Sequence, residues 1–316
     1  MAGRQNRRAV CPLKAGIETR NEGLLSNGRI IASFGRRYLV ELPDATILDC
    51  VTRGKRSDLA CGDFVTVGSS SPGEGVIEKT APRTTLLYRS DANRQKLIAA
   101  NVTQVVVVVA AVPEFHEALI DRCLAAAGHG EMATLIVLNK HDLAESTAAL
   151  AKLEPYRRLG YQLLALSAKQ DITPLRAHLQ NHTSVLVGQS GVGKSTMVNR
   201  LVPEAEARIG ELSAALDSGR HTTTHARLYH LDADSHIIDS PGMQEFGLHH
   251  LGIDGLAHAF VEFRPLLGTC RFRNCRHLHE PDCAIAAACA AGTISDRRLA
   301  SYRKLLEEID RKPRWP

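Results

Sequence analysis

The segment Gly188–Ser195 constrains the fold of this chain more than any other, because it reads G-Q-S-G-V-G-K-S between an apolar run and a helical pattern. In such a loop the glycines let main-chain N–H groups surround phosphate oxygens, the lysine neutralises their charge and the serine can ligate magnesium. A strand, this loop and a helix in succession predict a nucleotide-binding α/β domain. The predicted phosphate contacts are Gly188, Gln189, Ser190, Gly191, Val192, Gly193, Lys194, Ser195 and Thr196.

Around this loop, short apolar runs alternate with segments of helical length. The run Val102–Val112 is nearly continuous in β-branched residues, which is typical of a strand buried on both faces of a parallel sheet. Further runs follow at 134–139, 162–168, 184–188, 226–231 and 236–239. This alternation predicts an α/β sheet that binds its ligand at the carboxyl ends of the strands.

Two of these strands lead into residues that indicate guanine as the base. Asn139, Lys140, His141 and Asp142 fit the N-K-x-D pattern, in which the Asp carboxylate accepts from the ring N–H and exocyclic amine of guanine. Adenine lacks that donor pair and would leave the carboxylate unpaired. Lys140 can lie along the base plane, and Asn139 can join the phosphate and base loops. The next strand ends at Ser167, Ala168 and Lys169, which resemble a motif that contacts the guanine oxygen.

The nucleotide switch is predicted on both sides of the last two strands. Asp239–Gly242 fits D-x-x-G, which holds magnesium through water and offers the Gly242 N–H to the γ-phosphate. Thr223, with Thr222 as the alternative, is the expected hydroxyl ligand of magnesium in the segment before them. A run of threonines is also compatible with a plain edge strand.

Position 243 bears on the rate of hydrolysis. Many GTPases place Gln directly after D-x-x-G to orient the attacking water, whereas this chain has Met243. Unaided hydrolysis is therefore expected to be slow. His221 is a candidate to position the water once the switch is ordered, and the alternatives for His221 are a contact with RNA or a cap on the switch.

The order of the motifs differs from that of an ordinary GTPase. There the P-loop, the switch threonine and D-x-x-G precede N-K-x-D and S-A-K, but here the last two come first, at 139 and 167. Joining the old termini and opening the chain after D-x-x-G would rebuild the same sheet. The sequence therefore predicts a circularly permuted GTPase domain.

Cysteines cluster beyond this domain, with the spacing Cys270-x4-Cys275-x-His277-x5-Cys283. Three thiolates and an imidazole suit a closed tetrahedral zinc site. His279 competes with His277 for the nitrogen position, and Cys289 could replace Cys283. The polar residues between these ligands argue against a merely buried cysteine cluster. The following segment, 295–309, has helical periodicity.

The N-terminal part reads as a separate module. Between 28 and 85, five β-rich pieces are separated by Gly, Pro, Asp and Ser, which predicts a small barrel, most economically an OB-fold. Its exposed arginines are compatible with an oligonucleotide-binding face. The predicted division is a basic disordered tail at 1–21, the barrel at 22–90, the GTPase domain at 91–250 and a zinc-binding domain with a C-terminal helix at 251–316.

Charge and hydropathy limit the class of protein. The net charge is +5, but basic residues concentrate at both ends of the chain, which suits a polyanion such as RNA. The alternative is that the two basic ends are solvated tails without a binding role. A spanning segment and a secretion signal are lacking, so we expect a cytoplasmic monomer without membrane contact.

From about residue 24 to 310 the chain resembles the RsgA (YjeQ) family of circularly permuted bacterial GTPases. The resemblance is carried by G-Q-S-G-V-G-K-S-T, G-R-H-T-T-T-H-A-R-L-Y-H, D-S-P-G, N-K-H-D and C-R-F-R-N-C-R-H-L-H-E-P-D-C-A. It implies an OB-fold, a permuted GTPase domain and a zinc domain, and it favours Cys270, Cys275, His277 and Cys283 as the ligands of one structural Zn²⁺.

The same resemblance implies a function. A protein of this family would bind GTP with Mg²⁺, act in late maturation of the small ribosomal subunit and leave the subunit when GTP is hydrolysed. Small subunits and their rRNA are then the expected partners. The alternative is an RNA-binding checkpoint protein that depends on GTP but for which hydrolysis is incidental.

Overall fold

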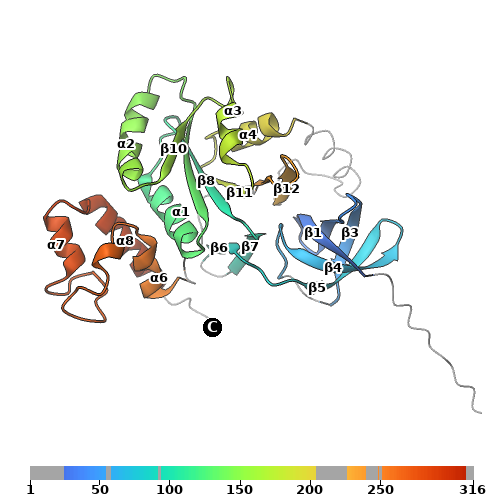
Figure 1. The fold of residues 1–316 in the computed structure, drawn as a ribbon, viewed down its shortest axis with the longest axis horizontal. Helices are drawn as coiled ribbons and strands as arrows, with labels where there is room; N and C mark the ends of the chain where they lie inside the picture. The colour runs from blue at the N-terminus through green and yellow to red at the C-terminus, as the bar shows by residue number, and fades with distance from the viewer. Residues whose placement is uncertain are drawn as a thin grey trace, which may run out of the picture.

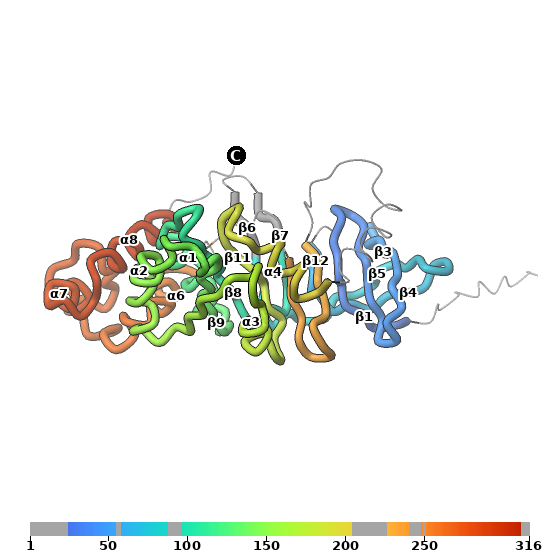
Figure 2. The backbone as a smooth tube through the Cα atoms, turned by 90° about the horizontal axis from the view of Figure 1, so that it is seen from above, coloured from blue at the N-terminus to red at the C-terminus, as the bar shows by residue number. Residues whose placement is uncertain are grey.

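The computed structural model describes residues 25–54, 58–91, 94–203, 226–239, 248 and 251–310, with backbone alone at 88–91 and 94–96. An N-terminal barrel, a central α/β domain and a C-terminal helical region lie in this order along the molecule (Figures 1 and 2). This confirms the predicted fold class. The predicted tail, 1–21, lies outside the described residues, and the predicted domain boundaries stay predictions.

Five strands close the barrel, as the sequence predicted. They are β1 (Leu25–Phe34), β2 (Arg37–Glu41), β3 (Ile47–Thr52), β4 (Phe64–Ser71) and β5 (Glu74–Thr80). Their order is β1-β2-β3-β5-β4, and β4 pairs back onto β1. Gly75 permits close packing inside, because a Cβ there would lie 2.5 Å from Val67 Cγ1. A hairpin of β6 (Leu86–Asp91) and β7 (Arg94–Ala100) connects the barrel to the next domain.

The central sheet has a P-loop strand in the middle and the guanine strands at one edge. Its order is β10-β9-β8-β11-β13-β12, parallel except for β12. All seven residues of β8 are buried, as its β-branched run predicted. The strands are β8 (Gln104–Ala110), β9 (Ala133–Asn139), β10 (Gln162–Ala165), β11 (Thr183–Val187), β12 (Arg227–His230) and β13 (His236–Asp239).

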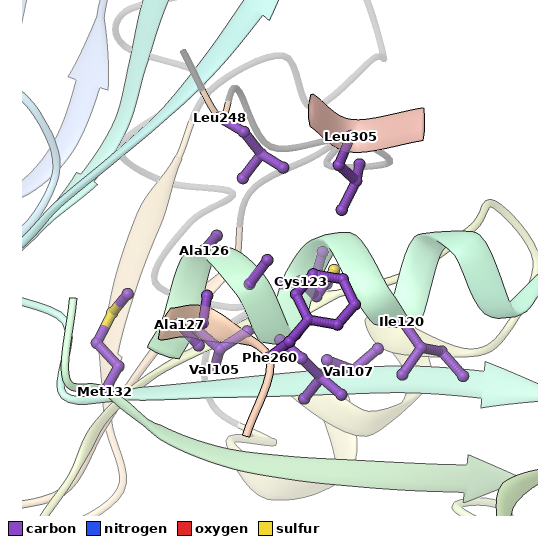
Figure 3. Packing of buried hydrophobic residues seen from close by; sticks show 14 of the residues in the cluster. Val105, Val107, Ile120, Cys123, Ala126, Ala127, Met132, Leu248, Phe260 and Leu305 are labelled. Carbon is purple, nitrogen blue, oxygen red and sulfur yellow. The ribbon is translucent and has the colours of Figure 1, made fainter. Parts of the chain in front are cut away.

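Helices cover both faces of this sheet, because successive side chains of a strand point to opposite faces. Val105, Val107 and Val109 of β8 belong to the core that contains α1 (Glu117–His129) and α2 (Ser146–Arg158). Figure 3 shows Val105 and Val107 pointing at α1, with Phe260 beside them. The alternate residues of β8 pack on the opposite face with α3 (Thr173–His178) and α4 (Lys194–Leu201).

The C-terminal region packs two of its helices, α6 (Gly252–Ala259) and α8 (Asp296–Asp310), against α1. It also contains the 3-10 turn η1 (Arg264–Leu266) and α7 (Ala284–Ala290). Phe260, Phe263 and Tyr302 form its aromatic centre, with ring centroids 5.1 to 5.5 Å apart. Helix α8 is the one predicted at 295–309. Within the described part of the chain, no helix has the length and apolar character that crossing a membrane requires.

A buried ion-pair network fastens this region to the α/β domain. Asp121 of α1 accepts hydrogen bonds from Arg297 (2.7 Å) and Arg298 (2.6 Å) of α8 and from the hydroxyl of Tyr156 (2.7 Å). Arg298 also donates to Glu262 at 2.6 Å. Burial would favour the neutral acid, but Arg298 and Arg297 outweigh it and hold the pKa of Asp121 below its usual range.

We expect Asp121→Asn to destabilise the protein by about 3–5 kcal/mol, because buried Arg298 and partly buried Arg297 lose their shared carboxylate. Urea unfolding at pH 7 measures this. The lowered pKa of Asp121 means that its contribution is present near pH 7 and is lost as the pH falls below about 4. The difference in free energy of unfolding between wild type and variant should therefore become smaller in acid.

Arg271→Gln is the matched control, because Arg271 and Asp282 form an ion pair in which both side chains are 65% exposed. We expect a change of less than about 1 kcal/mol there. Equal effects of the two variants would contradict the role assigned to the buried network.

Candidate nucleotide site and metal centre

The P-loop lies between β11 and α4, and two of its glycines are required by close contacts. Gly188 has φ +155°, and a Cβ there would lie 2.1 Å from the carbonyl oxygen of Val108. Gly193 has φ +103°, and its Cβ would lie 2.3 Å from Nδ2 of Asn139. These positions exclude side chains, so the backbone of the loop can lie close to its neighbours and to a phosphate.

Asn139 joins the P-loop to the second base loop, which is the S-A-K segment at Ser167–Lys169. At the end of β9 it is 2% exposed, and its Nδ2 donates to the carbonyl oxygen of Val192 at 2.8 Å. Its Oδ1 accepts from the N–H of Ala168 at 2.9 Å. The structure thus brings together three segments that lie far apart in the sequence, as the proposed tying role of Asn139 requires.

The remaining guanine-motif residues surround this junction. Lys140 has φ +58°, and its Nζ donates to the carbonyl oxygen of Val112 at 2.7 Å. The N–H of His141 donates to Leu166 at 3.0 Å, which keeps the two loops adjacent. Asp142 is exposed, and a hydrogen bond with Ser167 is the main cause that lowers its pKa. Asp142 is therefore an ionised acceptor, as the recognition of guanine N–H groups requires.

Ser167, Ala168 and Lys169 form the loop after β10. Ser167 and Ala168 are buried and Lys169 is exposed.

The sequence did not predict Val112 as a neighbour of the N-K-x-D loop, because Val112 contributes a backbone carbonyl that any residue type could supply. Lys140 and Val112 therefore meet through the fold and not through a sequence pattern.

Lys194 and Asp239 form the charged centre of the site. The ammonium of Lys194 donates to the carbonyl oxygens of Gly188 (2.6 Å) and Gln189 (2.8 Å). Burial lowers the pKa of Lys194, and burial raises the pKa of Asp239; each charge partly offsets the shift of the other. A phosphate oxygen would compensate the charge of the partly buried Lys194, and a hydrated divalent cation would compensate that of Asp239.

The predicted hydroxyl ligand Ser195 is in the first turn of α4, next to Lys194 and Thr196. The other predicted switch residues, His221, Thr223 and Gly242, lie outside the described residues, as does Met243. The described part of the site therefore comprises the P-loop, both base loops and Asp239.

The cysteine-rich loop between η1 and α7 gathers four potential metal ligands. The ligand atoms of Cys270, Cys275, His277 and Cys283 all lie within 4.8 Å of one another. Nδ1 of His277 is 3.6, 3.5 and 3.3 Å from the sulfurs of Cys270, Cys275 and Cys283. In a tetrahedral zinc site, bond lengths of about 2.3 Å to sulfur and 2.0 Å to nitrogen place such atoms about 3.5 Å apart.

The donor set and its spacing therefore fit a metal of zinc type. Burial lowers the pKa of His277, which favours the neutral imidazole that binds metals. The N–H of Ala284 donates to the sulfur of Cys270 at 3.3 Å and so orients one ligand. The two residues that competed in the sequence lie apart from this cluster: His279 is not among the four ligands, and Cys289 donates to Asp296 at 3.0 Å.

A P-loop, an N-K-x-D loop joined to it through Asn139, and the inverted chain order of the two define a circularly permuted GTPase. Comparison with known proteins agrees: the family model described as RsgA GTPase matches residues 80–249. The chain belongs to the RsgA GTPase family.

Curated relatives match over nearly the whole length. The protein named small ribosomal subunit biogenesis GTPase RsgA of Nitrosospira multiformis is 55% identical over 284 residues, covering 90% of this chain and 91% of that protein. Its namesake in Nitrosomonas europaea is 49% identical, covering 96% and 98%.

Two solved structures share the fold. YjeQ from Thermotoga maritima superimposes with a TM-score of 0.69 at 29% identity, covering 90% of this chain and 99% of that one. YloQ, described as a circularly permuted GTPase, has a TM-score of 0.67 at 27% identity, with coverage of 94% and 99%.

We expect Asn139→Ala to weaken GDP binding by about 10- to 100-fold, because it leaves the buried N–H of Ala168 and carbonyl of Val192 without their partner. Titration with a fluorescent GDP measures this. The control is Asn101→Ala: Asn101 is also buried and bonds Gly62 and Thr84, away from the P-loop. That variant should lose stability but keep its affinity. Equal affinities of wild type and Asn139→Ala would contradict the joining role.

Proposed function

We propose that this chain is a GTP hydrolase that binds the small ribosomal subunit, acts in its late maturation and leaves it when GTP is hydrolysed. The observation that carries the GTPase part is the pair of hydrogen bonds of Asn139, which hold the base loops next to the P-loop. The ribosomal part is supported by family membership and by the name that the curated relatives carry. That name designates hydrolases, so it does not favour a checkpoint protein with incidental hydrolysis.

In the proposed site each residue has a separate task. The P-loop N–H groups and Lys194 bind the β- and γ-phosphates, and Asp142 and the loop at Ser167 read the base. Ser195 and Thr223 would ligate Mg²⁺, and Asp239 would hold it through water. When bound, Mg²⁺ neutralises charge that develops on the phosphate oxygens. Gly242 would donate its N–H to the γ-phosphate.

Hydrolysis also needs a group that orients the attacking water. We assign this task to His221, because Met243 lacks a group that could accept a proton from the water or hold the water in line with the γ-phosphate. Binding to the subunit would order the segment that contains His221 and Thr223 and so accelerate turnover.

The four-residue cluster at Cys270, Cys275, His277 and Cys283 would hold one structural Zn²⁺. Its role is to fix the loop that joins η1 to α7, a stretch whose side chains are too polar to form a core by themselves. Exposed Arg271 and Arg273 on this loop place positive charge toward solvent, which suits rRNA phosphates. We infer a cytoplasmic monomer whose partners are GTP, GDP and the small subunit with its rRNA.

GTP turnover should rise by about 100-fold on addition of purified small subunits, since ordering a general base contributes on this order. Large subunits should leave the rate unchanged. In His221→Ala most of this stimulation should be lost while GTP binding persists, and the variant should stay on the subunit in a sedimentation assay. Equal wild-type rates with small, large and no subunits would remove the ribosomal proposal. Full stimulation of His221→Ala would remove the catalytic role of His221.

Metal analysis should find about one zinc per chain, and Cys275→Ser should reduce it to near zero because a tetrahedral site loses one of four ligands. The variant should also lose binding to small subunits while keeping GDP affinity. Cys289→Ser is the matched control, since its sulfur bonds Asp296 outside the cluster. Purified protein without metal, or a metal-free Cys275→Ser that binds subunits normally, would contradict the proposal.

A further inference from the structure

The barrel is joined to the strand next to Asp239 by backbone pairing. Strand β1 of the barrel pairs antiparallel with β12 of the central sheet, with Ala32 opposite Arg227. On its other side, Arg227 lies opposite Asp239 of β13. Arg227 thus stands between the barrel and Asp239, whose charge acts on Lys194.

The side chain of Arg227 also belongs to the barrel interface. Its guanidinium carbon lies 5.3 Å from the ring centroid of Phe34, on β1. It interacts with the Tyr229 hydroxyl, whereas its Nε is buried without a hydrogen-bond partner among the described residues. Stacking on Phe34 is therefore a main source of its orientation, and such a contact is worth about 0.5–1 kcal/mol.

Two other contacts connect the β12–β13 hairpin to the barrel, and a third connects the barrel to the neighbouring strand β11. Nε2 of His230 lies 2.7 Å from a carboxylate oxygen of Glu41, on β2. Cys61, from the barrel loop before β4, belongs to one buried core with Leu228 and Ile238. Arg29 of β1 donates to Thr183, where β11 begins, at 2.9 Å. The barrel therefore contacts the hairpin through backbone pairing, the His230–Glu41 hydrogen bond and apolar packing.

These contacts matter because the hairpin is small. Each of its strands has four residues, and β12 would be an outer edge of the central sheet if β1 did not cover it. Short edge strands are among the elements that open most readily. Any displacement of β12 would pass to Asp239 through the cross-strand pair with Arg227.

We propose that the barrel contributes to the GTPase site. Phe34 holds Arg227 by stacking, and Phe34 and Arg227 are therefore positioning residues for Asp239. This inference rests on the proposed function, in that Asp239 serves the hydrated Mg²⁺ during GTP hydrolysis. It assigns to the barrel a task beyond binding RNA.

The test compares Phe34→Ala, which removes the stack, with Phe34→Tyr, which keeps an aromatic ring in the same place. We expect Phe34→Ala to lower kcat for GTP by about three- to fivefold at saturating Mg²⁺, with KM changed by less than about twofold. It should also raise the Mg²⁺ concentration that half-saturates binding of a fluorescent GTP analogue. Phe34→Tyr should match the wild type in both measurements. With small subunits, the maximal rate should fall while the subunit concentration for half-stimulation stays unchanged.

Thermal melting separates positioning from stability. If Phe34→Ala melts earlier but its kcat and Mg²⁺ requirement equal those of wild type, the stack is only structural and the inference is overturned. A wild type without GTP turnover would contradict the proposed function alone. The Mg²⁺ requirement for binding would then still decide the inference: a rise in Phe34→Ala supports it, and no change overturns it.

Discussion

Backbone hydrogen bonding across one continuous sheet sets the position of the described segments of the nucleotide site. The sheet runs from β10 at the guanine edge to the barrel strand β4. In its parallel part, one strand separates β9 from β11, and β11 is next to β13, so their carboxyl ends lie along the same edge. Asn139, Gly188 and Asp239 lie at those ends. Because a shift of one residue would turn each buried side chain to the other face, the apolar pattern of the strands also fixes the register of the site.

Circular permutation leaves this arrangement intact because strand pairing depends on neighbours in space and not on their order in the chain. What permutation changes is the covalent attachment of the outer modules. The barrel now precedes the strand β8, and the segment after Asp239 leads to α6 and the cysteine loop. The chain thus enters the α/β domain from the barrel at the amino end of β8 and leaves it for the C-terminal region after Asp239.

The two modules are fastened to the α/β domain by different interactions. The barrel uses backbone pairing, a shared apolar core and the contacts of Arg227 and His230. The C-terminal region shares that apolar core and adds ion pairs, in which Asp121 and Glu262 balance Arg297 and Arg298. Buried ion pairs tolerate few alternative geometries, because a misplaced partner leaves an uncompensated charge. The zinc-type cluster therefore has a well-defined place relative to α1.

The sequence by itself determined the elements and the chemistry of this protein. Local patterns include the P-loop glycines, the N-K-x-D residues and the Cys3His spacing. The β-branched run of β8 is another, and it predicts that this strand is buried. Local patterns cannot report which distant residues touch. Only the tertiary structure decided that Asn139 bonds both Val192 and Ala168, that His277 and not His279 joins the cysteine cluster, and that Arg227 stacks on Phe34. The physical reason is that each such contact depends on how separate strands and helices pack, which no single segment encodes.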